Sequence, residues 1–593
     1  MKKKTQTPLA LRGNKERAKL SEEDTKNTCL VRNYRFPVYL LLSLTFYVSL
    51  LVLNSCLDYA GYNYFTVQVR RFADAMLFAL PVLFFHKKRF LFSYIMIVNL
   101  YLLSNIWYYR NYGTLMPMTS YTMVGNLQGL GPSIWSSIKG SDGWILFPSI
   151  CFMAYYAASG NVFSKGRLRE DWKYIGGSIF IILMVILPSY IIHPRTEYAH
   201  PYSLYTNEVV RAFKQLGFIN YWCYQANYLR GCTSEEKDYA VKFMKGQIDN
   251  QSFDPLVEKH QKNLILILVE SLQAWPVNLT IDGREVTPYL NSLAKKENVL
   301  YFSKVLPQVK GGRSSDAQLL LNTGLLPIVT GAAASLYGTN EYPSLSKALS
   351  GYGYTSVSLL CDDKAYWNQE ATSKGYGFGK LYDRMAKGNS MIRADENLFK
   401  YSLPILEKER QPFYAQLVTM SGHDAVKSDF ESCFNEVKFE DDIVRYNLVI
   451  TEYVDRCIGQ FVESLKKSGL YDKSVIVITG DHDSVSYDKF EGRKKCELSD
   501  RFVPLFILNT PLKAECDKVI GQSDIYPTLL DMMGVEGYLF HGLGESVFRH
   551  QSDCAVYHTG EHIGNCKSDS VVEYKKELWK LSDILIRMDY FKK

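Results

Sequence analysis

The sequence lacks the patterns that identify the common nucleic-acid-binding and nucleotide-binding classes. It has no zinc-finger spacing of cysteines, no basic face interleaved with aromatic residues and no phosphate-binding glycine loop of the P-loop kind. The residues before the first long apolar run show no cleavable signal pattern. These absences argue against zinc-finger and P-loop chemistry, and we expect no nucleic-acid partner.

The composition indicates an integral membrane protein with more than one folding unit. A chain of 593 residues is too long for one hydrophobic core, and 47% of its residues are apolar, with 43 Tyr and 31 Phe. The formal charge is +7, and Lys and Arg crowd residues 1–35 and a few short loops between apolar runs. This distribution is typical of segments that orient a protein in a membrane. We therefore predict that residues 1–35 are a basic cytoplasmic tail.

Long apolar runs predict a multi-pass α-helical membrane domain at residues 36–193. A helix needs about 20 apolar residues to cross a bilayer. About five spans are predicted: Phe36–Leu57, Phe72–His86, Phe90–Tyr109, Trp144–Phe163 and Tyr174–His193. With the N-terminus inside, the basic loops at 86–89 and 165–173 are cytoplasmic, as the positive-inside rule requires, but Arg70 and Arg71 fall on the wrong side. An odd number of spans places everything after about residue 194 outside.

The segment after the last span is mixed polar and aromatic, and we interpret residues 194–262 as a connector with one helix at Glu208–Leu216. Nine of the 12 cysteines lie outside the tail and membrane domain, so at least one of the nine is unpaired. Two pairs are close enough in sequence to form disulfides in an oxidising compartment: Cys223 with Cys232, and Cys554 with Cys566. Free buried cysteines are the alternative.

From residue 263 to residue 593, short β-rich runs alternate with amphipathic helices. Strands are predicted at Leu264–Val269, Val299–Phe302, Thr355–Leu360, Phe413–Val418, Val475–Ile478 and Val503–Leu508. Helices are predicted at Tyr289–Lys296, Ser344–Leu349, Asp442–Lys467 and Ser523–Met533. The alternation is typical of an α/β domain with a mixed, mostly parallel sheet between two layers of helices.

Two of the predicted strands end abruptly in residues that can bind a metal. Val475–Asp483 ends in Gly-Asp-His-Asp, which places Asp481 and His482 at the sheet edge where open α/β sheets bind ligands. Asn263–Ser271 carries Glu270 after its apolar run, and that carboxylate is costly to bury unless it is paired or bound to a metal. The alternatives are a solvated turn for the Asp-His pair and a salt bridge or helix cap for Glu270.

A serine stands where a loop runs into a predicted helix. In Gly311–Leu321, Ser314 or Ser315 lies near the helix N-terminus, where free backbone N–H groups favour an alkoxide and an incoming phosphate. Simple N-capping is the alternative. His423 follows another predicted strand and is a candidate for contacting a phosphate, binding a second metal or capping a loop. One divalent metal would explain four of these positions together: Glu270, Ser314, Asp481 and His482.

These motifs make the chain similar to the lipoteichoic acid synthase-like and phosphoethanolamine transferase-like membrane proteins of the alkaline phosphatase–sulfatase superfamily. In lipoteichoic acid synthases a strand-end Glu, a nucleophilic Thr within Gly-Lys-Thr-Ser-Asp and an Asp-His pair bind one divalent metal. The resemblance of Gly312-Arg-Ser-Ser-Asp316 to that stretch implies that Ser314 is the nucleophile. It also implies that His423 contacts the phosphate, with Arg313 beside the nucleophile. Ser523–Gly534 is similar to the late helix of the superfamily.

Two departures from the family pattern bear on the substrate. Ser replaces the nucleophilic Thr, which keeps the hydroxyl. Leu359–Gln369 is similar to the stretch that holds the headgroup in glycerol-phosphate polymerases, and it keeps Trp367 but has Leu360 and Gln369 at the His and Arg positions. Losing those groups weakens the affinity for glycerol phosphate. The adjacent carboxylates of Asp362 and Asp363 would suit an ammonium headgroup such as ethanolamine.

The resemblance predicts a transferase that moves phosphoglycerol or phosphoethanolamine from a membrane phospholipid, through a covalent Ser314 intermediate, to an envelope glycan, lipid or polymer. It implies one divalent metal: manganese by likeness to lipoteichoic acid synthases, zinc by likeness to phosphoethanolamine transferases, and magnesium also fits the ligand set. It also implies a bacterial cytoplasmic membrane with the catalytic domain outside. The alternatives are a membrane-tethered phosphodiesterase or sulfatase-type hydrolase, and a non-catalytic membrane binding protein. The oligomeric state is left open.

Overall fold

The computed structural model describes residues 35–57, 65–84, 87–112, 115–118, 120, 135, 137–159, 175–184, 209–229, 231–249, 256–257, 262–387, 393–423, 430–535, 537–549 and 552–592. The chain divides into two compact units. The helical unit consists of Met1–Met116 and Ile134–Asn227, and the α/β unit consists of Pro117–Ser133 and Tyr228–Lys593. The predicted cytoplasmic tail lies outside the described residues, except for Arg35 at its end.

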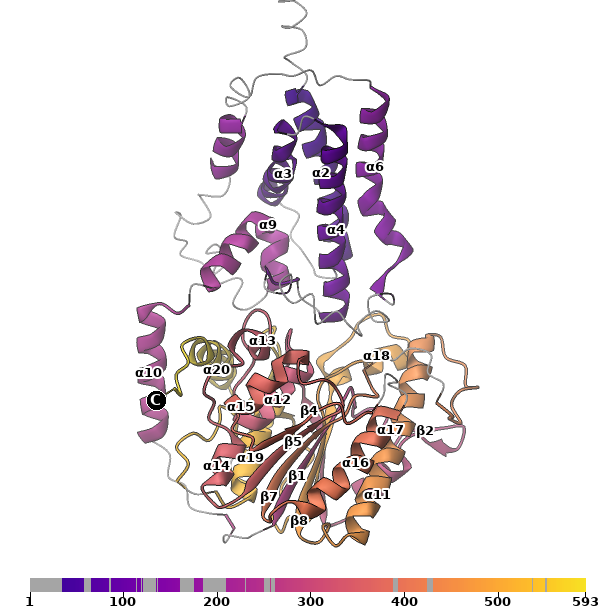
Figure 1. The fold of residues 1–593 in the computed structure, drawn as a ribbon, viewed down its shortest axis with the longest axis vertical. Helices are drawn as coiled ribbons and strands as arrows, with labels where there is room; N and C mark the ends of the chain where they lie inside the picture. Colours follow the sequence, from indigo (N-terminus) through magenta and orange to yellow (C-terminus); the bar gives the residue numbers. More distant parts are fainter. Residues whose placement is uncertain are drawn as a thin grey trace, which may run out of the picture. The chain divides into compact units, whose positions relative to one another are not determined.

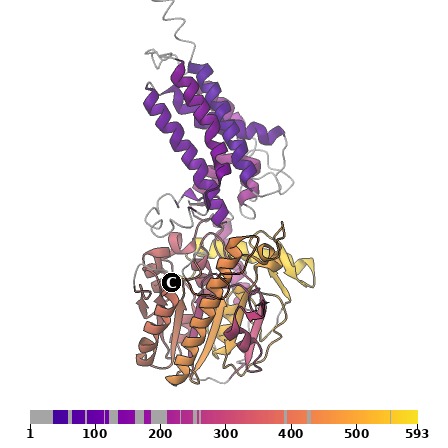
Figure 2. The ribbon, with the colours of Figure 1, turned by 90° about the vertical axis from the view of Figure 1, so that its right-hand side faces the viewer.

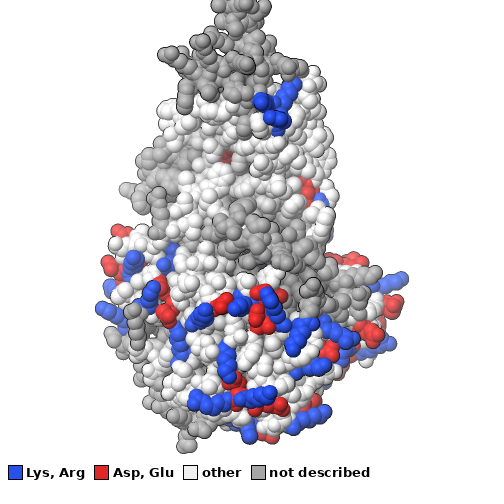
Figure 3. Space-filling view, viewed as in Figure 1, with Lys and Arg blue, Asp and Glu red and all other residues white. Residues whose placement is uncertain are grey.

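The helical unit is built from helices that lie side by side (Figures 1 and 2). Its described elements are α2 (Arg35–Cys56), α3 (Phe65–Ala79), η1 (Leu80–Leu83), α4 (Lys88–Tyr112), η4 (Gly140–Asp142), α6 (Gly143–Ala158), Ile175–Met184 and α9 (Val209–Tyr228). Charged side chains are few on the visible, described part of this unit, whereas Lys, Arg, Asp and Glu are scattered over the visible face of the α/β unit (Figure 3). An uncharged outer face is what a lipid environment requires.

Two of the five predicted spans are helices long and apolar enough to cross a bilayer, Phe36–Cys56 and Lys88–Arg110. The helix at the fourth predicted span, α6, has 16 residues, and the rest of that span lies outside the described residues. The fifth is described only over Ile175–Met184. A five-span topology therefore stays a prediction.

The second predicted span is wrong at its start, because α3 begins at Phe65 and not at Phe72. The charged residues at this point hold α9 in place. Asp74 accepts hydrogen bonds from the backbone N–H groups of Phe218 (2.8 Å) and Ile219 (3.0 Å), directly after Gly217 (φ 81°) interrupts α9. Asp74 thus satisfies donors that the broken helix leaves free, so its burial among apolar helices has a structural reason.

The arginines next to Asp74 have the same function. Arg70 donates to the Gln215 carbonyl (3.3 Å), and Arg71 donates to the Lys214 carbonyl (3.2 Å). These contacts explain why basic residues occur where the positive-inside rule does not expect them. Gly217 interrupts α9 directly after Leu216, where the predicted helix ends, and a second helical segment continues to Tyr228.

The α/β unit is organised around one eight-stranded mixed sheet, in the order β10-β4-β9-β8-β1-β7-β5-β6. Its strands are β1 (Asn263–Val269), β4 (Val299–Leu306), β5 (Thr355–Leu360), β6 (Lys380–Tyr382), β7 (Phe413–Val418), β8 (Ser474–Gly480), β9 (Val503–Leu508) and β10 (Ile520–Gly521). Neighbours pair in parallel except β9, which runs antiparallel to β4 and β8. All six predicted strands are confirmed, and the two that were missed, β6 and β10, are very short.

Helices cover both faces of this sheet, as predicted (Figure 1). One layer contains α11 (Pro288–Ala294), α16 (Ala394–Lys408) and α17 (Asp442–Lys467), and the other contains α12 (Ser314–Thr323), α14 (Leu345–Ser350), α19 (Ile525–Met532) and α20 (Asp569–Arg587). Alternate residues of β1 serve the two cores: Leu264, Leu266 and Leu268 face one, and Ile265, Ile267 and Val269 face the other. Both faces of the strand are buried, which explains its uninterrupted apolar sequence.

The remaining described elements are short or lie at the margins of the unit. They are α10 (Ser234–Asp249), α13 (Ala333–Tyr337), α15 (Gln369–Gly375), α18 (Tyr487–Phe490), η5 (Tyr366–Asn368), η7 (Leu498–Arg501), η8 (Gln522–Asp524), β2 (Thr280–Ile281), β3 (Arg284–Glu285), β11 (Cys554–Val556) and β12 (His562–Gly564). Helix α10, which falls within the predicted connector, packs on α20 through a hydrogen bond from Tyr239 to Glu577 (2.6 Å).

One of the two predicted disulfides is confirmed. Cys554 and Cys566 are bonded and close the β11–β12 hairpin. The predicted bond between Cys223 and Cys232 is wrong, since both are free. The thiol of Cys232 instead faces the Ile584 carbonyl in α20, at 3.7 Å. Closeness in sequence allowed this bond, but the fold turns the Cys232 side chain towards another helix.

The central strand offers a test of how much the sheet core contributes to stability. Ile267 is fully buried in β1, so Ile267→Ala removes apolar contacts and leaves a cavity that typically costs about 2–5 kcal/mol. We expect a clearly lower midpoint in thermal unfolding of the full chain in detergent. Leu539→Ala, at a side chain that is 72% exposed, is the control and should change the midpoint little. Equal effects of the two substitutions would contradict the assignment of the core.

Candidate active site

The candidate site lies where β1 and β8 end side by side. These strands pair in parallel with Val269 opposite Gly480, so the residues that follow them, Glu270 and Asp481, emerge next to each other. Gly480 has no room for a side chain, because a Cβ there would lie 2.0 Å from the Leu272 carbonyl oxygen. The strand pairing therefore brings together residues far apart in sequence, as expected for the carboxyl edge of such a sheet.

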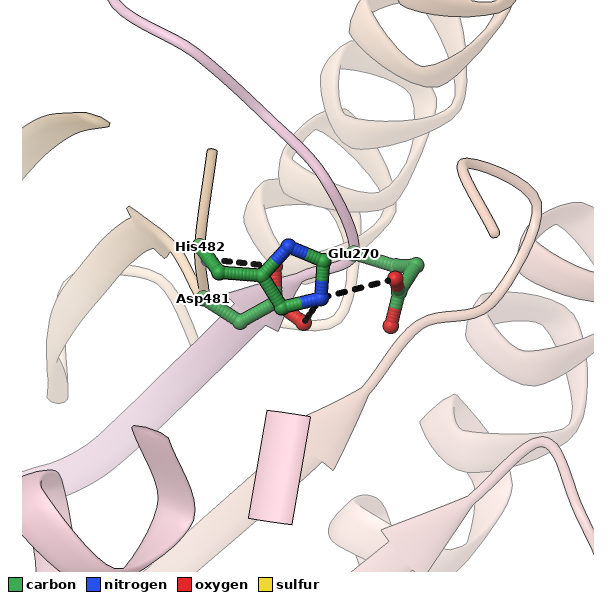
Figure 4. Close-up of side chains that lie close together, drawn as sticks. All are labelled: Glu270, Asp481 and His482. Atoms are coloured by element: carbon green, nitrogen blue, oxygen red, sulfur yellow. Dashed lines mark hydrogen bonds and ion pairs between the residues drawn. The ribbon is translucent and has the colours of Figure 1, made fainter. Parts of the chain in front are cut away.

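Glu270, Asp481 and His482 form a compact buried group, the acid–imidazole triad. Their side chains are 6%, 1% and 5% exposed, and one ligand atom from each lies within 4.8 Å of the others. The Nε2 atom of His482 is 3.3 Å from Glu270 Oε1 and 3.4 Å from Asp481 Oδ2 (Figure 4). Two carboxylates and one imidazole match the donors that manganese, zinc and magnesium accept.

The electrostatics of the triad also suit a cation. Burial, reinforced by the charge of Glu270, raises the pKa of Asp481 to about 7. Burial alone would also raise the pKa of Glu270, but His482 and His423 outweigh it and hold that pKa well below its usual range. The nearby histidines do not provide enough positive charge to keep both carboxylates ionised. A bound dication would provide the missing positive charge.

His482 is oriented for metal binding by its own loop. Its Nδ1 lies 2.9 Å from the Asp483 carbonyl oxygen. Arg313 Nη2 lies 3.0 Å from the same Nδ1, so Nε2, which faces the carboxylates, is the ring nitrogen placed to bind a cation. Asp481 Oδ1 accepts from the backbone N–H groups of Ser271 and His482, both at 2.7 Å, so that Oδ2 is the oxygen facing the imidazole.

The hydroxyl of Ser314 points into the triad. It lies at the start of α12, donates to Glu270 Oε2 at 2.8 Å and lies 3.3 Å from His482 Nε2. The loop before it is braced by Asp316, whose Oδ2 accepts from the backbone N–H groups of Lys310 and Gly312, both at 2.9 Å. The four predicted metal positions are therefore all within reach of one ion.

Arg313 precedes Ser314 and has a positive φ of 44°, a backbone conformation in which a non-glycine residue is strained. Its Nη2 donates to the Asp483 carbonyl oxygen at 2.7 Å, and its Nη1 lies 3.8 Å from Asp483 Oδ1. Arg501 pairs with the same carboxylate at 2.5 Å. Asp483 was part of the predicted Gly-Asp-His-Asp motif, but the sequence prediction missed Arg501, because Arg501 carries no motif and only the fold brings it to this loop.

The predicted substrate-binding residues differ in whether they lie near the triad and in whether they are already paired. His423 lies near the triad, with Nδ1 3.6 Å from Glu270 Oε1. Asp362 follows β5, and burial raises its pKa to about 6 against the opposing effect of His423. Asp363 is already paired with Arg384. Trp367 is half-buried in η5 and has a positive φ of 49°.

A second group of acidic and sulfur ligands, Asp488, Cys496 and Asp500, also lies within 4.8 Å. We assign no metal to it, because Arg493 already pairs with Asp500. It provides a useful control for the triad.

The comparisons with known proteins identify both halves of the chain. The sulfatase family matches residues 262–535, and the lipoteichoic acid synthase N-terminal domain matches residues 22–231. The chain is therefore similar to lipoteichoic acid synthases in both parts, with the synthase N-terminal domain followed by a sulfatase-family domain. It is accordingly an enzyme of the phosphotransferase type.

Curated relatives match along most of this lipoteichoic acid synthase-like protein. Lipoteichoic acid synthase 2 of Bacillus subtilis is 29% identical over 476 residues, covering 75% of this chain and 72% of the relative. Lipoteichoic acid synthase of Staphylococcus saprophyticus is 27% identical over 525 residues, covering 82% and 80%.

Two solved structures share the fold. Lipoteichoic acid synthase LtaP from Listeria monocytogenes has a TM-score of 0.50 and 22% identity, covering 58% of this chain and 98% of the other. Lipooligosaccharide phosphoethanolamine transferase A from Neisseria meningitidis, an integral membrane protein, has a TM-score of 0.51 and 13% identity, covering 84% and 95%.

Metal binding at the triad predicts a specific change in stability. A cation that binds only the folded state adds about 2.7 kcal/mol to the free energy of unfolding at 100 times its Kd. Manganese, zinc or magnesium chloride should therefore raise the unfolding midpoint of the full chain in detergent. The double substitution Asp481→Asn, His482→Ala should abolish this rise, and Asp488→Asn in the second group should not. An unchanged rise in the double variant would place the cation elsewhere.

Proposed function

We propose that this enzyme transfers a phosphoglycerol or phosphoethanolamine group from a membrane phospholipid to an acceptor outside the cytoplasmic membrane of a bacterium. The proposal is carried by one observation: the Ser314 hydroxyl points into the acid–imidazole triad, 2.8 Å from Glu270. A hydroxyl in this position is a candidate nucleophile. The names of the relatives, lipoteichoic acid synthases and a phosphoethanolamine transferase, support this class of reaction.

The reaction would proceed in two steps. Ser314 Oγ attacks phosphorus, its proton leaving towards Glu270, and the bond from phosphorus to the diacylglycerol oxygen breaks. Diacylglycerol leaves as the alcohol, and the headgroup phosphate stays on Ser314 as a phosphodiester. An acceptor hydroxyl of a glycan, lipid or growing polymer then attacks phosphorus, and Ser314 regains its proton.

A divalent cation held by Glu270, Asp481, His482 and Ser314 would stabilise the serine alkoxide and withdraw charge from the phosphoryl oxygens. Resemblance to the lipoteichoic acid synthases favours manganese, and the donors also suit zinc or magnesium. Arg313 and His423 are the proposed contacts for the phosphoryl oxygens, since both lie beside the triad and can donate to an anion.

The membrane anchor favours a lipid donor. Two helices of the helical unit are apolar and long enough to cross a bilayer. We propose that residues 36–193 anchor the enzyme in several passes, with the tail at 1–35 in the cytoplasm, and that residues 194–262 connect them to an extracytoplasmic catalytic domain at 263–593. Anchoring the site at a membrane raises the effective concentration of the phospholipid.

The covalent step can be tested by intact-mass analysis. The full chain, incubated in detergent with manganese or zinc and either phosphatidylglycerol or phosphatidylethanolamine, should gain the mass of the corresponding headgroup phosphate at Ser314. Ser314→Ala should gain none, and Ser315→Ala is the control because its hydroxyl is turned away to the Gly312 carbonyl (2.7 Å). Hydrolysis of the lipid without any adduct would favour the phosphodiesterase alternative. An intact lipid with wild type would favour a binding protein.

The headgroup preference depends on which carboxylate is available. Asp363 is paired with Arg384, and its pKa is held below its usual range by the Ala365 backbone N–H and by that pair. Asp362 instead lies within electrostatic reach of His423 and Glu270, on the triad side. We propose that Asp362, and not Asp363, contacts the headgroup, where an ammonium such as ethanolamine would be bound by a charge-assisted hydrogen bond.

Substituting each carboxylate and measuring the KM for both lipids tests which headgroup the enzyme prefers. A hydrogen bond to a charged group contributes about 1.5–3 kcal/mol, so Asp362→Ala should raise the KM for phosphatidylethanolamine by about 10-fold or more and affect phosphatidylglycerol less. Asp363→Ala is the matched control and should change either KM little. Equal losses with both lipids would remove the ethanolamine hypothesis and leave phosphoglycerol transfer.

A further inference from the structure

We infer that Asp395 is a positioning residue that holds His423 at the active site. The inference rests on the proposed function, in which His423 contacts the transferred phosphoryl group. Asp395 lies in the first turn of α16, outside every motif of the sequence, and is completely buried. A carboxylate in such a place is costly unless it makes hydrogen bonds that the fold needs.

The hydrogen bonds of Asp395 tie α16 to the loop after β7. Asp395 Oδ1 accepts from the backbone N–H groups of Met420 (2.8 Å) and Ser421 (3.0 Å). In return, the backbone N–H of Asp395 donates to Ser421 Oγ at 3.2 Å. The link therefore runs in both directions, as in a capping box, and it fixes both the position and the orientation of the loop.

The same loop carries His423 to the triad. The backbone N–H of His423 donates to the Met420 carbonyl at 3.0 Å, which closes a turn over residues 420–423. Gly422 lies against Glu270, since a Cβ at this position would be 2.1 Å from the Glu270 carbonyl oxygen. The turn thus has little freedom between the Asp395 side chain and Glu270, and the imidazole of His423 comes to 3.6 Å from Glu270 Oε1.

The start of α16 also holds the loop on the headgroup side. The thiol of Cys361, at the end of β5 and directly before Asp362, donates to the Ala394 carbonyl at 3.5 Å. One helix terminus therefore anchors both the loop with His423 and the loop with Asp362. The bond from Cys361 goes to the backbone of Ala394, so Asp395→Ala leaves the headgroup-side loop in place and acts on the loop of His423.

The other oxygen of Asp395, Oδ2, is buried and makes no hydrogen bond among the described residues. Because only one oxygen accepts hydrogen bonds from the loop, two substitutions of Asp395 can be compared. Asp395→Asn keeps an oxygen at Oδ1 to accept from the loop, whereas Asp395→Ala removes both bonds. If the residue acts by positioning, the asparagine variant should keep most of the activity that the alanine variant loses.

The chain offers a matched control in Asp455. This buried carboxylate in α17 accepts from the backbone N–H groups of Tyr289 (2.9 Å) and Leu290 (2.8 Å), at the start of α11. It makes the same kind of hydrogen bond as Asp395, but to α11 instead of to a loop that carries a site residue. Asp455→Ala should lower the unfolding midpoint without a comparable loss of kcat.

The test measures diacylglycerol release from phosphatidylglycerol and phosphatidylethanolamine by the full chain in detergent. Removing a group that orients a functional histidine typically costs about 10–100-fold in activity, and we expect Asp395→Ala to lower kcat by that amount. Because Asp395 acts through His423, adding Asp395→Ala to His423→Ala should cause no further loss. Asp395→Asn should stay within about threefold of wild type, since both loop bonds persist.

Two results would overturn the inference. One is a loss from Asp395→Ala that multiplies fully with the loss from His423→Ala, and the other is an equal loss of kcat from Asp455→Ala. Should Asp395→Ala not fold, Ser421→Ala decides, because it removes the reciprocal bond and keeps the Asp395 carboxylate that accepts from the loop. A loss in Ser421→Ala that disappears in the His423→Ala background supports positioning, and unchanged kcat overturns it. Failure of the proposed function is distinct, since wild type itself would then release no diacylglycerol.

Discussion

The parallel pairing of β1 with β8 is the constraint on which the rest of the site depends. It brings Glu270 next to Asp481, with His482 against both, and all three side chains are buried. Two like charges about 4 Å apart repel by about 4 kcal/mol in a partly shielded protein site. The fully apolar interiors of β1 and β8 hold the groups together against this repulsion, since each buried Leu or Ile side chain contributes about 1.5–3 kcal/mol. The sheet core thus maintains a site whose own charges favour its opening unless a cation is bound.

Around this constraint, the chain repeatedly uses a buried carboxylate to hold backbone N–H groups. Five examples are Asp74, Asp316, Asp395, Asp455 and Asp481. In each case the acceptor satisfies donors at a helix start or in a loop, where no regular partner exists. Three of the five fix loops that carry Ser314, His423 or Glu270. The loops at the site are therefore ordered by side chains, although they contain little regular secondary structure.

In the helical unit, too, polar side chains among apolar helices make hydrogen bonds to backbone groups. Charged residues are not expected in or beside a membrane span, but Arg70, Arg71 and Asp74 each make a hydrogen bond to a backbone group around the break in α9. In a membrane-facing bundle, polar side chains are placed inside and paired. Their role here is structural, and no catalytic function needs to be assigned to them.

The sequence by itself determined the local features of this protein: the strand that ends on Glu270, the strand that ends on Asp481 and His482, and Ser314 at a helix start. Each depends on a short pattern of apolar residues followed by polar ones, and this pattern can be recognised without knowing the tertiary contacts. It also determined the apolar helices, because these depend on the length of apolar runs.

Only the tertiary structure decided which distant groups meet. It paired Asp363 with Arg384, brought Arg501 to Asp483, directed the Cys232 thiol to the Ile584 carbonyl and bonded Asp395 to the loop of His423. None of these contacts leaves a local signal, because each joins residues from separate elements whose side chains fit either a solvated or a buried position. The hydrophobic packing of the sheet and helices brings those elements together, and that packing fixes which charges remain free for a substrate.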